Sequence, residues 1–217
     1  MDLICLPAQA DGRGRVGVRE PIICEGRVIG VLKRAYAEAL REGAFPVSYA
    51  CGRLLYAITR ALATATQGLR AVEVGSGLGF STIWLAAALA DAGAGGVLYA
   101  IEADEVRARR AGENLADAGL SGYVRLVAGD ALEVLPELPG PFHLAFIDGR
   151  KDQYPAYLRL LEPKMPEGSL LMAHNAIWPP SRGVAEFLTY LSRPGSGWLT
   201  VILPVDPAGV SLSIKLG

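Results

Sequence analysis

From residue 70 onward, short runs of Val, Ile, Leu and Ala alternate with segments of helical periodicity. The apolar runs are nearly continuous, which is typical of strands that are covered on both faces. Strands that alternate with helices in this way form a parallel sheet, because each helix returns the chain to the start of the next strand. We therefore expect an α/β fold with a doubly wound, mostly parallel, seven-stranded Rossmann-like sheet. The expected strands are 70–75, 97–103, 124–130, 142–149, 168–175, 199–205 and 209–216.

The two ends of the chain add to this expectation. The last two strands are joined only by the stretch DPAG, and a parallel pair would need a crossover of about a dozen residues. The last strand should therefore run antiparallel to its neighbours. Near the other end, helical periodicity at 31–43 and 48–66 predicts a helical N-terminal cover, with Ser48 as a candidate cap. We interpret the chain as a single domain, with this cover over 1–67 and an α/β core over 68–217.

The net charge and the cysteine content of the chain indicate which binding partners and which cellular compartment to expect. The formal net charge of −1 gives no attraction to nucleic acid or to an anionic membrane, so we expect a small-molecule partner. Cys5, Cys24 and Cys51 have no CxxC spacing, and their sparse, odd number argues against a disulfide framework or a thiolate zinc site. Residues 1–14 show no signal-peptide pattern, and a cytoplasmic location is the expectation.

The stretch AVEVGSGLGFST, residues 71–82, carries a strand through a glycine-rich turn into a helix. A phosphate-binding P-loop would need a lysine after its last glycine, and a dinucleotide fingerprint would need GxGxxG, whereas position 80 is Phe. Glu73, just before the turn, would repel a pyrophosphate but suits a positively charged ligand. The alternative is that the glycines form only a tight turn.

Two more acidic residues follow the next two strands. Glu102 ends the strand 97–103, where a carboxylate can accept hydrogen bonds from both ribose hydroxyls. Asp130 ends the strand 124–130, where it could meet an adenine amino group. Either residue could instead cap the helix that follows it. Together with the turn, they predict a site for an adenine nucleoside that carries positive charge and no phosphate, and S-adenosylmethionine has this chemistry.

Three motifs, VEVGSGLGFST, FIDGRKDQY and HNAIW, occur in this order along the chain. With them, residues 20–217 resemble the class I S-adenosylmethionine-dependent O-methyltransferases of the catechol and caffeoyl-CoA type. The resemblance implies S-adenosylmethionine as cofactor, a homodimer, and a ribose site at Glu102. It also implies that the methionine part is held at Glu73, Gly75, Gly77 and Ser81, the adenine at Asp130 and Ala131, and that Asp148 borders the cofactor.

The same resemblance implies a catalytic, metal-binding end of the site. Asp148 corresponds to the metal-binding aspartate of the family, and Lys151, three residues later, corresponds to its general base. The family has an Asp-Asn pair after the fifth strand, whereas this chain has His174-Asn175. The implied catalytic residues are thus Lys151, Asp148 and His174, and the implied metal ligands are Asp148, His174 and Asn175.

His174 in place of an aspartate leaves three alternatives open. Magnesium prefers oxygen ligands, whereas imidazole better suits manganese, iron, nickel or zinc. His174 could ligate a softer metal, or it could leave a weakened magnesium or manganese site at Asp148 and Asn175. In the third alternative the site is metal-free, and His174 acts as a base or as a hydrogen-bond donor to the substrate.

The expected activity is methyl transfer to a hydroxyl of a small, aromatic, catechol-like molecule. One alternative is a catalytically altered S-adenosylmethionine-binding protein, which the changed metal motif favours. Another is a methyltransferase that acts on a nitrogen or on RNA, which the net charge disfavours. Trp178 could form an aromatic wall over the substrate or have a simple packing role.

Overall fold

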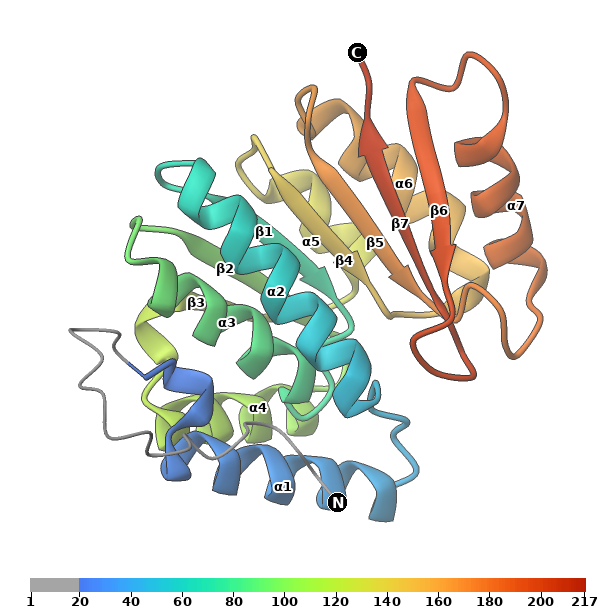
Figure 1. Cartoon of the computed structure of the whole chain (residues 1–217). Helices are drawn as coiled ribbons and strands as arrows, with labels where there is room; N and C mark the ends of the chain where they lie inside the picture. Colours follow the sequence, from blue (N-terminus) through green and yellow to red (C-terminus); the bar gives the residue numbers. More distant parts are fainter. Residues whose placement is uncertain (1–19) are drawn as a thin grey trace, which may run out of the picture.

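The structure is a computed structural model that describes residues 20–217. In this part of the chain, seven strands form one sheet in the order β3-β2-β1-β4-β5-β7-β6 (Figure 1). Strands β1 to β5 are parallel, and β7 pairs antiparallel with both β5 and β6. The predicted sheet and its antiparallel last strand are therefore confirmed. The strands are β1 (Arg70–Val74), β2 (Val97–Glu102), β3 (Val124–Ala128), β4 (Leu144–Ile147), β5 (Leu170–His174), β6 (Trp198–Leu203) and β7 (Val210–Lys215).

Helices cover both faces of the sheet (Figure 1). One apolar core joins the sheet to α1 to α4, and a second joins its other face to α5 to α7. The α-helices are α1 (Gly26–Arg41), α2 (Tyr49–Ala65), α3 (Phe80–Ala92), α4 (Glu105–Ala118), α5 (Ala131–Glu137), α6 (Tyr154–Leu161) and α7 (Arg182–Ser192). Short 3-10 turns are η1 (Ile22–Cys24), η2 (Ser121–Tyr123), η3 (Lys151–Gln153) and η4 (Glu162–Lys164).

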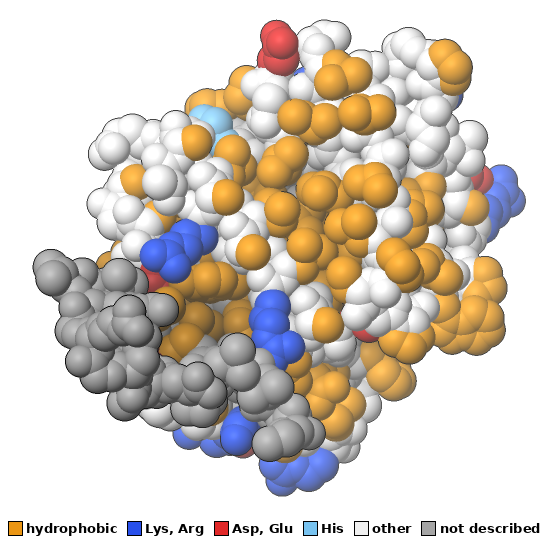
Figure 2. Space-filling view, in the orientation of Figure 1, with side chains coloured by type: hydrophobic (Ala, Val, Ile, Leu, Met, Phe, Trp, Pro, Cys, Tyr) orange, Lys and Arg blue, Asp and Glu red, His pale blue; other side chains and the backbone are white. Residues whose placement is uncertain are grey.

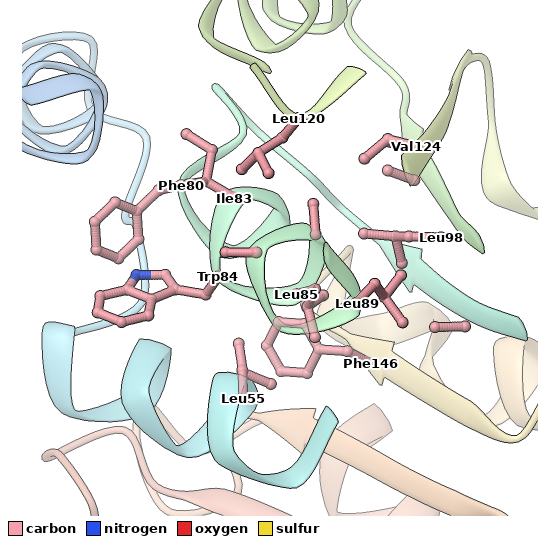
Figure 3. Close-up of a cluster of buried hydrophobic side chains, with 14 of the residues drawn as sticks. Leu55, Phe80, Ile83, Trp84, Leu85, Leu89, Leu98, Leu120, Val124 and Phe146 are labelled. Atoms are coloured by element: carbon pink, nitrogen blue, oxygen red, sulfur yellow. The ribbon is translucent and has the colours of Figure 1, made fainter. Parts of the chain in front are cut away.

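Helices α2 and α3 pack beside each other on one face of the sheet (Figure 1), and the first ten residues of α3 are all buried (Figure 3). A helix that is apolar on every side needs neighbours on every side, and α2 supplies one of them. Gly52 of α2 has no side chain, and a Cβ there would overlap the Trp84 indole ring. The Ser48 hydroxyl oxygen accepts a hydrogen bond from the Cys51 amide at 3.1 Å, which confirms Ser48 as the cap of α2.

The register of the sheet aligns the ends of its central strands. Val74 lies opposite Ile101 of β2 and opposite Ile147 of β4. The residues that follow these three strands therefore meet at one edge of the sheet. On the outer side, β6 is an edge strand, and hydrophobic side chains are exposed on the face of β6 and β7 seen in Figure 2.

The cysteine expectation needs a correction. Cys24 is disulfide-bonded, so the argument against disulfide bonding is wrong for this residue. The spacing of cysteines along a chain does not determine which of them meet in space. Cys51 is a free, buried thiol. Cys5 and the segment 1–14 lie outside the described residues. Within residues 20–217, no helix combines the length and the apolar character that a membrane span requires.

Glu73 is a fully buried carboxyl group in β1. Side chains alternate along a strand, and this alternation turns Glu73 towards α3, where the Thr82 hydroxyl donates to its Oε2 at 2.6 Å. Its Oε1 has no hydrogen-bond partner among the described residues. Burial raises the pKa of Glu73 to about 7, and the nearby Asp148 and Glu102 carboxylates also raise it.

We predict that Gly52→Ala lowers the free energy of unfolding by about 1–3 kcal/mol, because the added methyl group forces α2 away from Trp84. Gly30→Ala in α1 is the matched control, because nothing lies within 4 Å of a Cβ at that position. The control should leave stability unchanged or raise it by up to about 1 kcal/mol. Urea unfolding followed by circular dichroism measures both, and equal stabilities for the two variants would contradict the packing argument.

We also predict that Glu73 makes the stability of the protein depend on pH. Its pKa is higher in the folded chain than in the unfolded chain, so its contribution is most favourable below pH 4.5 and decreases as pH rises towards about 7. Glu73→Gln keeps an acceptor for Thr82 and removes the ionisation. Between pH 5 and pH 8 the wild type should lose about 2–3 kcal/mol more stability than this variant. Parallel pH profiles of unfolding free energy for the two proteins would refute the prediction.

Candidate functional site

A cavity of about 460 Å³ opens at the carboxyl ends of β1, β2 and β4. This is the edge at which ligands bind in doubly wound sheets, beside the point where the strand order reverses, here between β1 and β4. The segment 43–47 between α1 and α2 lines its other side. The cavity is of a size that suits a nucleoside-sized ligand. Of the predicted cofactor residues, those in its wall are Gly75, Gly77, Ser81, Glu102, Asp130, Ala131 and Asp148.

The glycine turn is held close to the end of β4. Gly75 has φ +89°, and a Cβ there would lie 2.6 Å from the Asp148 carbonyl oxygen. Any side chain at position 75 would therefore push the two strand ends apart. The Asp148 amide donates to the Val74 carbonyl at 2.8 Å, which continues the β1–β4 pairing to this point. The turn thus lays its backbone along one wall of the cavity.

Glu102 is held rigidly at the end of β2. Its Oε2 accepts a hydrogen bond from the Gly77 amide at 2.7 Å, and its Oε1 accepts one from the Asp104 amide at 3.1 Å. A carboxylate offers about four acceptor positions, so two remain after these bonds. Glu102 is 8% exposed and lines the cavity, where the remaining positions are available to hydroxyl groups.

Asp130 has the capping role that the sequence left open. Its Oδ1 accepts a hydrogen bond from the Leu132 amide at 2.8 Å, at the start of α5. The side chain and the neighbouring Ala131 also line the cavity. Glu73, in contrast, is not in the cavity wall, since it lies beneath the glycine turn against Thr82. The structure therefore places its carboxyl group below the expected cofactor site.

Asp148 joins the cavity to a group of polar side chains. Its Oδ1 accepts a hydrogen bond from Lys151 Nζ at 2.6 Å, and the same ammonium group is 3.0 Å from the Tyr154 hydroxyl. Lys151 begins η3, which positions it one turn after the strand end. The Tyr154 ring is buried, and its hydroxyl donates to the His174 carbonyl oxygen at 3.2 Å. Lys151 is thus fixed against Asp148, which lines the cavity.

His174 lies between two carboxylates. Its Nδ1 is 3.4 Å from Asp148 Oδ1, and its Nε2 is 3.4 Å from Asp206 Oδ2. Burial lowers the pKa of His174, but the hydrogen bond to Asp148 and the charges of Asp148 and Asp206 outweigh burial, and the pKa is raised. Asp206 was missed at the level of sequence, because an aspartate in a DPAG turn has no signal beyond that of an ordinary turn residue.

Asn175 and Trp178 face each other rather than the cavity. The Asn175 side-chain amide donates to the Trp178 carbonyl oxygen at 2.8 Å, and the Asn175 backbone has φ 60°. The Trp178 ring is 62% exposed and is not among the cavity residues. The Asn175 amide group is therefore bonded to the Trp178 backbone, and Asn175 is not among the cavity residues.

The predicted ligand set of Asp148, His174 and Asn175 does not fit a magnesium ion. A lysine ammonium group occupies Asp148 Oδ1, an imidazole replaces the second carboxylate, and the Asn175 amide is turned to Trp178. Magnesium requires several oxygen ligands in near-ideal octahedral geometry. No step of a reaction is assigned to a metal at these three residues.

Parts of this chain are similar in sequence to a known family and to known proteins. Residues 72–176 match a family model described as a methyltransferase domain. A catechol O-methyltransferase of Mycobacterium tuberculosis is 39% identical over 54% of this chain and 52% of that protein. A catechol O-methyltransferase of Niastella koreensis is 38% identical over 54% of this chain and 53% of its own length. The matched segment spans about half the length of each relative.

A solved structure extends the match. The O-methyltransferase TomG of Streptomyces achromogenes, which is involved in tomaymycin synthesis and was crystallised in complex with S-adenosylmethionine, is 30% identical to this chain. The comparison covers 86% of this chain and 90% of TomG, with a TM-score of 0.71. Because this similarity in sequence and fold extends over most of both chains, the protein belongs to the S-adenosylmethionine-dependent O-methyltransferases.

Proposed function

We propose that this protein transfers the methyl group of S-adenosylmethionine to a hydroxyl of a small, aromatic, catechol-like molecule. The observation that carries the proposal is that Asp148, which lines the cavity, is paired with the Lys151 ammonium group at 2.6 Å. A cofactor bound along the glycine turn would direct its sulfonium methyl group towards Asp148 and Lys151. The lysine could then accept the proton of the acceptor hydroxyl. The names of the matched relatives support the acceptor class, and the expected homodimer stays a prediction.

Residues of the cavity wall would hold the cofactor. S-adenosylmethionine supplies a methyl group that is activated by its positively charged sulfur. Glu102 would accept hydrogen bonds from the ribose hydroxyls, since its carboxylate is already oriented by two backbone amides. The wall formed by Asp130 and Ala131 would lie beside the adenine. The close turn at Gly75 would leave room for the methionine part of the cofactor.

The carboxylates around the cavity would favour a cationic ligand. Glu102 and Asp148 line the cavity, and Glu73 lies beneath its wall. These negative charges act on one another, since Asp148 and Glu102 contribute to the raised pKa of Glu73. A positively charged sulfonium would relieve this repulsion, whereas the phosphates of a dinucleotide would increase it. The electrostatics therefore agree with the choice of cofactor.

Lys151 is the proposed general base. Once its ammonium group has released a proton to solvent, the neutral amine would take the proton of the acceptor hydroxyl as the oxygen attacks the methyl group, and Asp148 would stabilise the ammonium that forms again. The 2.6 Å contact between the two side chains holds the lysine against Asp148, which lines the cavity. The protein would further raise the rate by aligning the acceptor oxygen with the methyl group. Phe45, which is 89% exposed at the cavity, offers an aromatic surface for a planar acceptor.

The cofactor assignment is tested by Glu102→Gln. Removal of the charge weakens the hydrogen bonds to the ribose, and we expect the affinity for S-adenosylmethionine to fall about tenfold or more, in line with the loss of about 1.5–3 kcal/mol for a hydrogen bond to a charged group. Isothermal titration calorimetry measures this change. Glu105→Gln, on the exposed first turn of α4, is the matched control and should bind as the wild type does. If both variants bind equally well, Glu102 does not hold the ribose.

The catalytic assignment is tested by Lys151→Met. Loss of a general base should lower kcat for catechol methylation by about 10²- to 10⁴-fold, while the Kd for S-adenosylmethionine stays within about twofold of the wild type. Lys33→Met, on the exposed side of α1, is the control. Transfer of labelled methyl to catechol, measured in the presence of a chelator, gives the rate. A wild type that binds the cofactor but methylates no catechol would favour a catalytically altered binding protein or an acceptor of another class, such as a nitrogen or RNA.

A further inference from the structure

Three side chains with different metal-binding atoms converge beside the Asp148–Lys151 pair. The Cys51 thiol comes from α2, the His174 imidazole from the end of β5, and the Asp206 carboxylate from the turn between β6 and β7. One ligand atom from each residue lies within 4.8 Å of the other two. These three residues, called here the Cys-His-Asp cluster, differ from the ligand set that the family resemblance implies, since neither Cys51 nor Asp206 belongs to that set.

The imidazole in this cluster has an unused nitrogen. The His174 side chain is 8% exposed, and its Nε2 is buried without a hydrogen-bond partner, although Asp206 Oδ2 is 3.4 Å away. A buried polar atom without a partner costs free energy, and native structures rarely leave one. Cys51 is fully buried beside it. A cation bound between the three side chains would coordinate the Nε2 atom directly, in place of its long 3.4 Å contact with Asp206.

The other ring nitrogen is oriented as in a metal site. His174 Nδ1 is 3.4 Å from Asp148 Oδ1. Histidines that bind metals almost always direct their second nitrogen to a carboxylate, carbonyl or water, which fixes the tautomer that leaves the binding nitrogen free. Asp148 would have this role here. Its contact with His174 therefore favours metal binding through Nε2, on the side of the Cys-His-Asp cluster.

Asp206 is also held in place. Its Oδ2 accepts a hydrogen bond from the Ser48 hydroxyl at 2.7 Å, and its Oδ1 accepts bonds from the Ala208 and Gly209 amides at 3.0 Å each. These bonds fix the carboxylate against the start of α2, one turn from Cys51. A preorganised ligand loses little entropy when a metal binds, which is the arrangement expected of a built site.

We propose that Cys51, His174 and Asp206 bind one divalent cation of the zinc class, with an open fourth position. Sulfur, imidazole nitrogen and carboxylate oxygen are ligands of zinc, whereas magnesium would reject the thiol. Ligands of a tetrahedral zinc lie about 3.3–3.8 Å from one another, as follows from bond lengths of about 2.0–2.3 Å. The 3.4 Å separation of His174 Nε2 and Asp206 Oδ2 is in this range. Cys51 would bind as a thiolate and release its proton to solvent.

The bound cation would join three parts of the fold. It would tie α2 to the end of β5 and to the β6–β7 turn, next to the residues proposed for catalysis. This inference stands apart from the proposed activity, since metal binding requires neither the cofactor nor an acceptor. A failure of one proposal therefore leaves the other in place.

The test is metal titration of the full chain after treatment with a chelator. We expect one Zn²⁺ per chain by calorimetry, and for Co²⁺ an absorption spectrum with a thiolate-to-cobalt charge-transfer band. Cys51→Ala should abolish that band, and Cys51→Ala and Asp206→Asn should each weaken zinc binding at least tenfold. Millimolar Mg²⁺ should not compete. Asp152→Asn, a change of an exposed aspartate outside the cluster, is the matched control and should bind zinc as the wild type does.

Two outcomes would overturn the proposal. The first is a wild-type chain that takes up no stoichiometric zinc, in which case His174 is only an imidazole held between two carboxylates. The second is zinc binding and a cobalt spectrum that Cys51→Ala and Asp206→Asn leave unchanged. Far-ultraviolet circular dichroism and calorimetry with S-adenosylmethionine show whether each variant is folded, so lost metal binding can be told apart from unfolding.

Discussion

The close contact between Gly75 and the Asp148 backbone is the constraint on which the site depends. It brings the turn after β1 against the end of β4, at a distance that only a residue without a side chain allows. One consequence is that the cavity wall and the Asp148 carboxylate share a single edge of the sheet. Another is that Lys151, three residues after Asp148, is held against a carboxylate of the cavity wall. The close backbone contact between Gly75 and Asp148 therefore positions both the proposed cofactor site and the proposed catalytic residues.

Asp148 is the electrostatic centre of this edge. It pairs with the Lys151 ammonium group, faces His174 Nδ1, and contributes to the raised pKa of the buried Glu73 carboxyl. One carboxylate thus acts on the proposed base, on an imidazole and on the buried Glu73 carboxyl group beneath the cavity. Removal of its charge would leave the lysine unpaired in a partly buried position, which costs more than the loss of a surface ion pair. The roles of these side chains cannot be separated from the placement of Asp148.

Much of the fold could be predicted because its signals are local. Continuous apolar runs mark buried parallel strands, and the short DPAG connection requires an antiparallel last strand. Glu102 lies in the cavity wall and accepts a hydrogen bond from the Gly77 amide, because the end of the second strand is beside the turn after the first; its role in ribose binding stays a prediction. The position of Glu73 depended instead on the alternation of side chains along β1, which turns it beneath the cavity towards Thr82.

The Cys-His-Asp cluster could not have been predicted from local signals. Its residues are far apart in the chain, and they meet because β7 is inserted between β5 and β6 and brings the β6–β7 turn to the start of α2. A single cysteine on a helix is typical of an apolar core. Thiolate zinc sites are recognised in a sequence from closely spaced pairs of cysteines, and this chain has no such pair. Contacts made by strand insertion leave no periodic pattern in the sequence.

The replacement of an aspartate by His174 bears on both proposals, although neither depends on the other. A carboxylate at position 174 would share a cation with Asp148 and would compete with Lys151 for it. An imidazole directs one nitrogen to Asp148 and the other away from it, towards Asp206. Asp148 is then free to hold Lys151, and the proposed cation would lie at the buried junction of α2 with the β6–β7 turn. On this interpretation, deprotonation of the acceptor relies on the lysine, and a bound metal would stabilise the scaffold beside it.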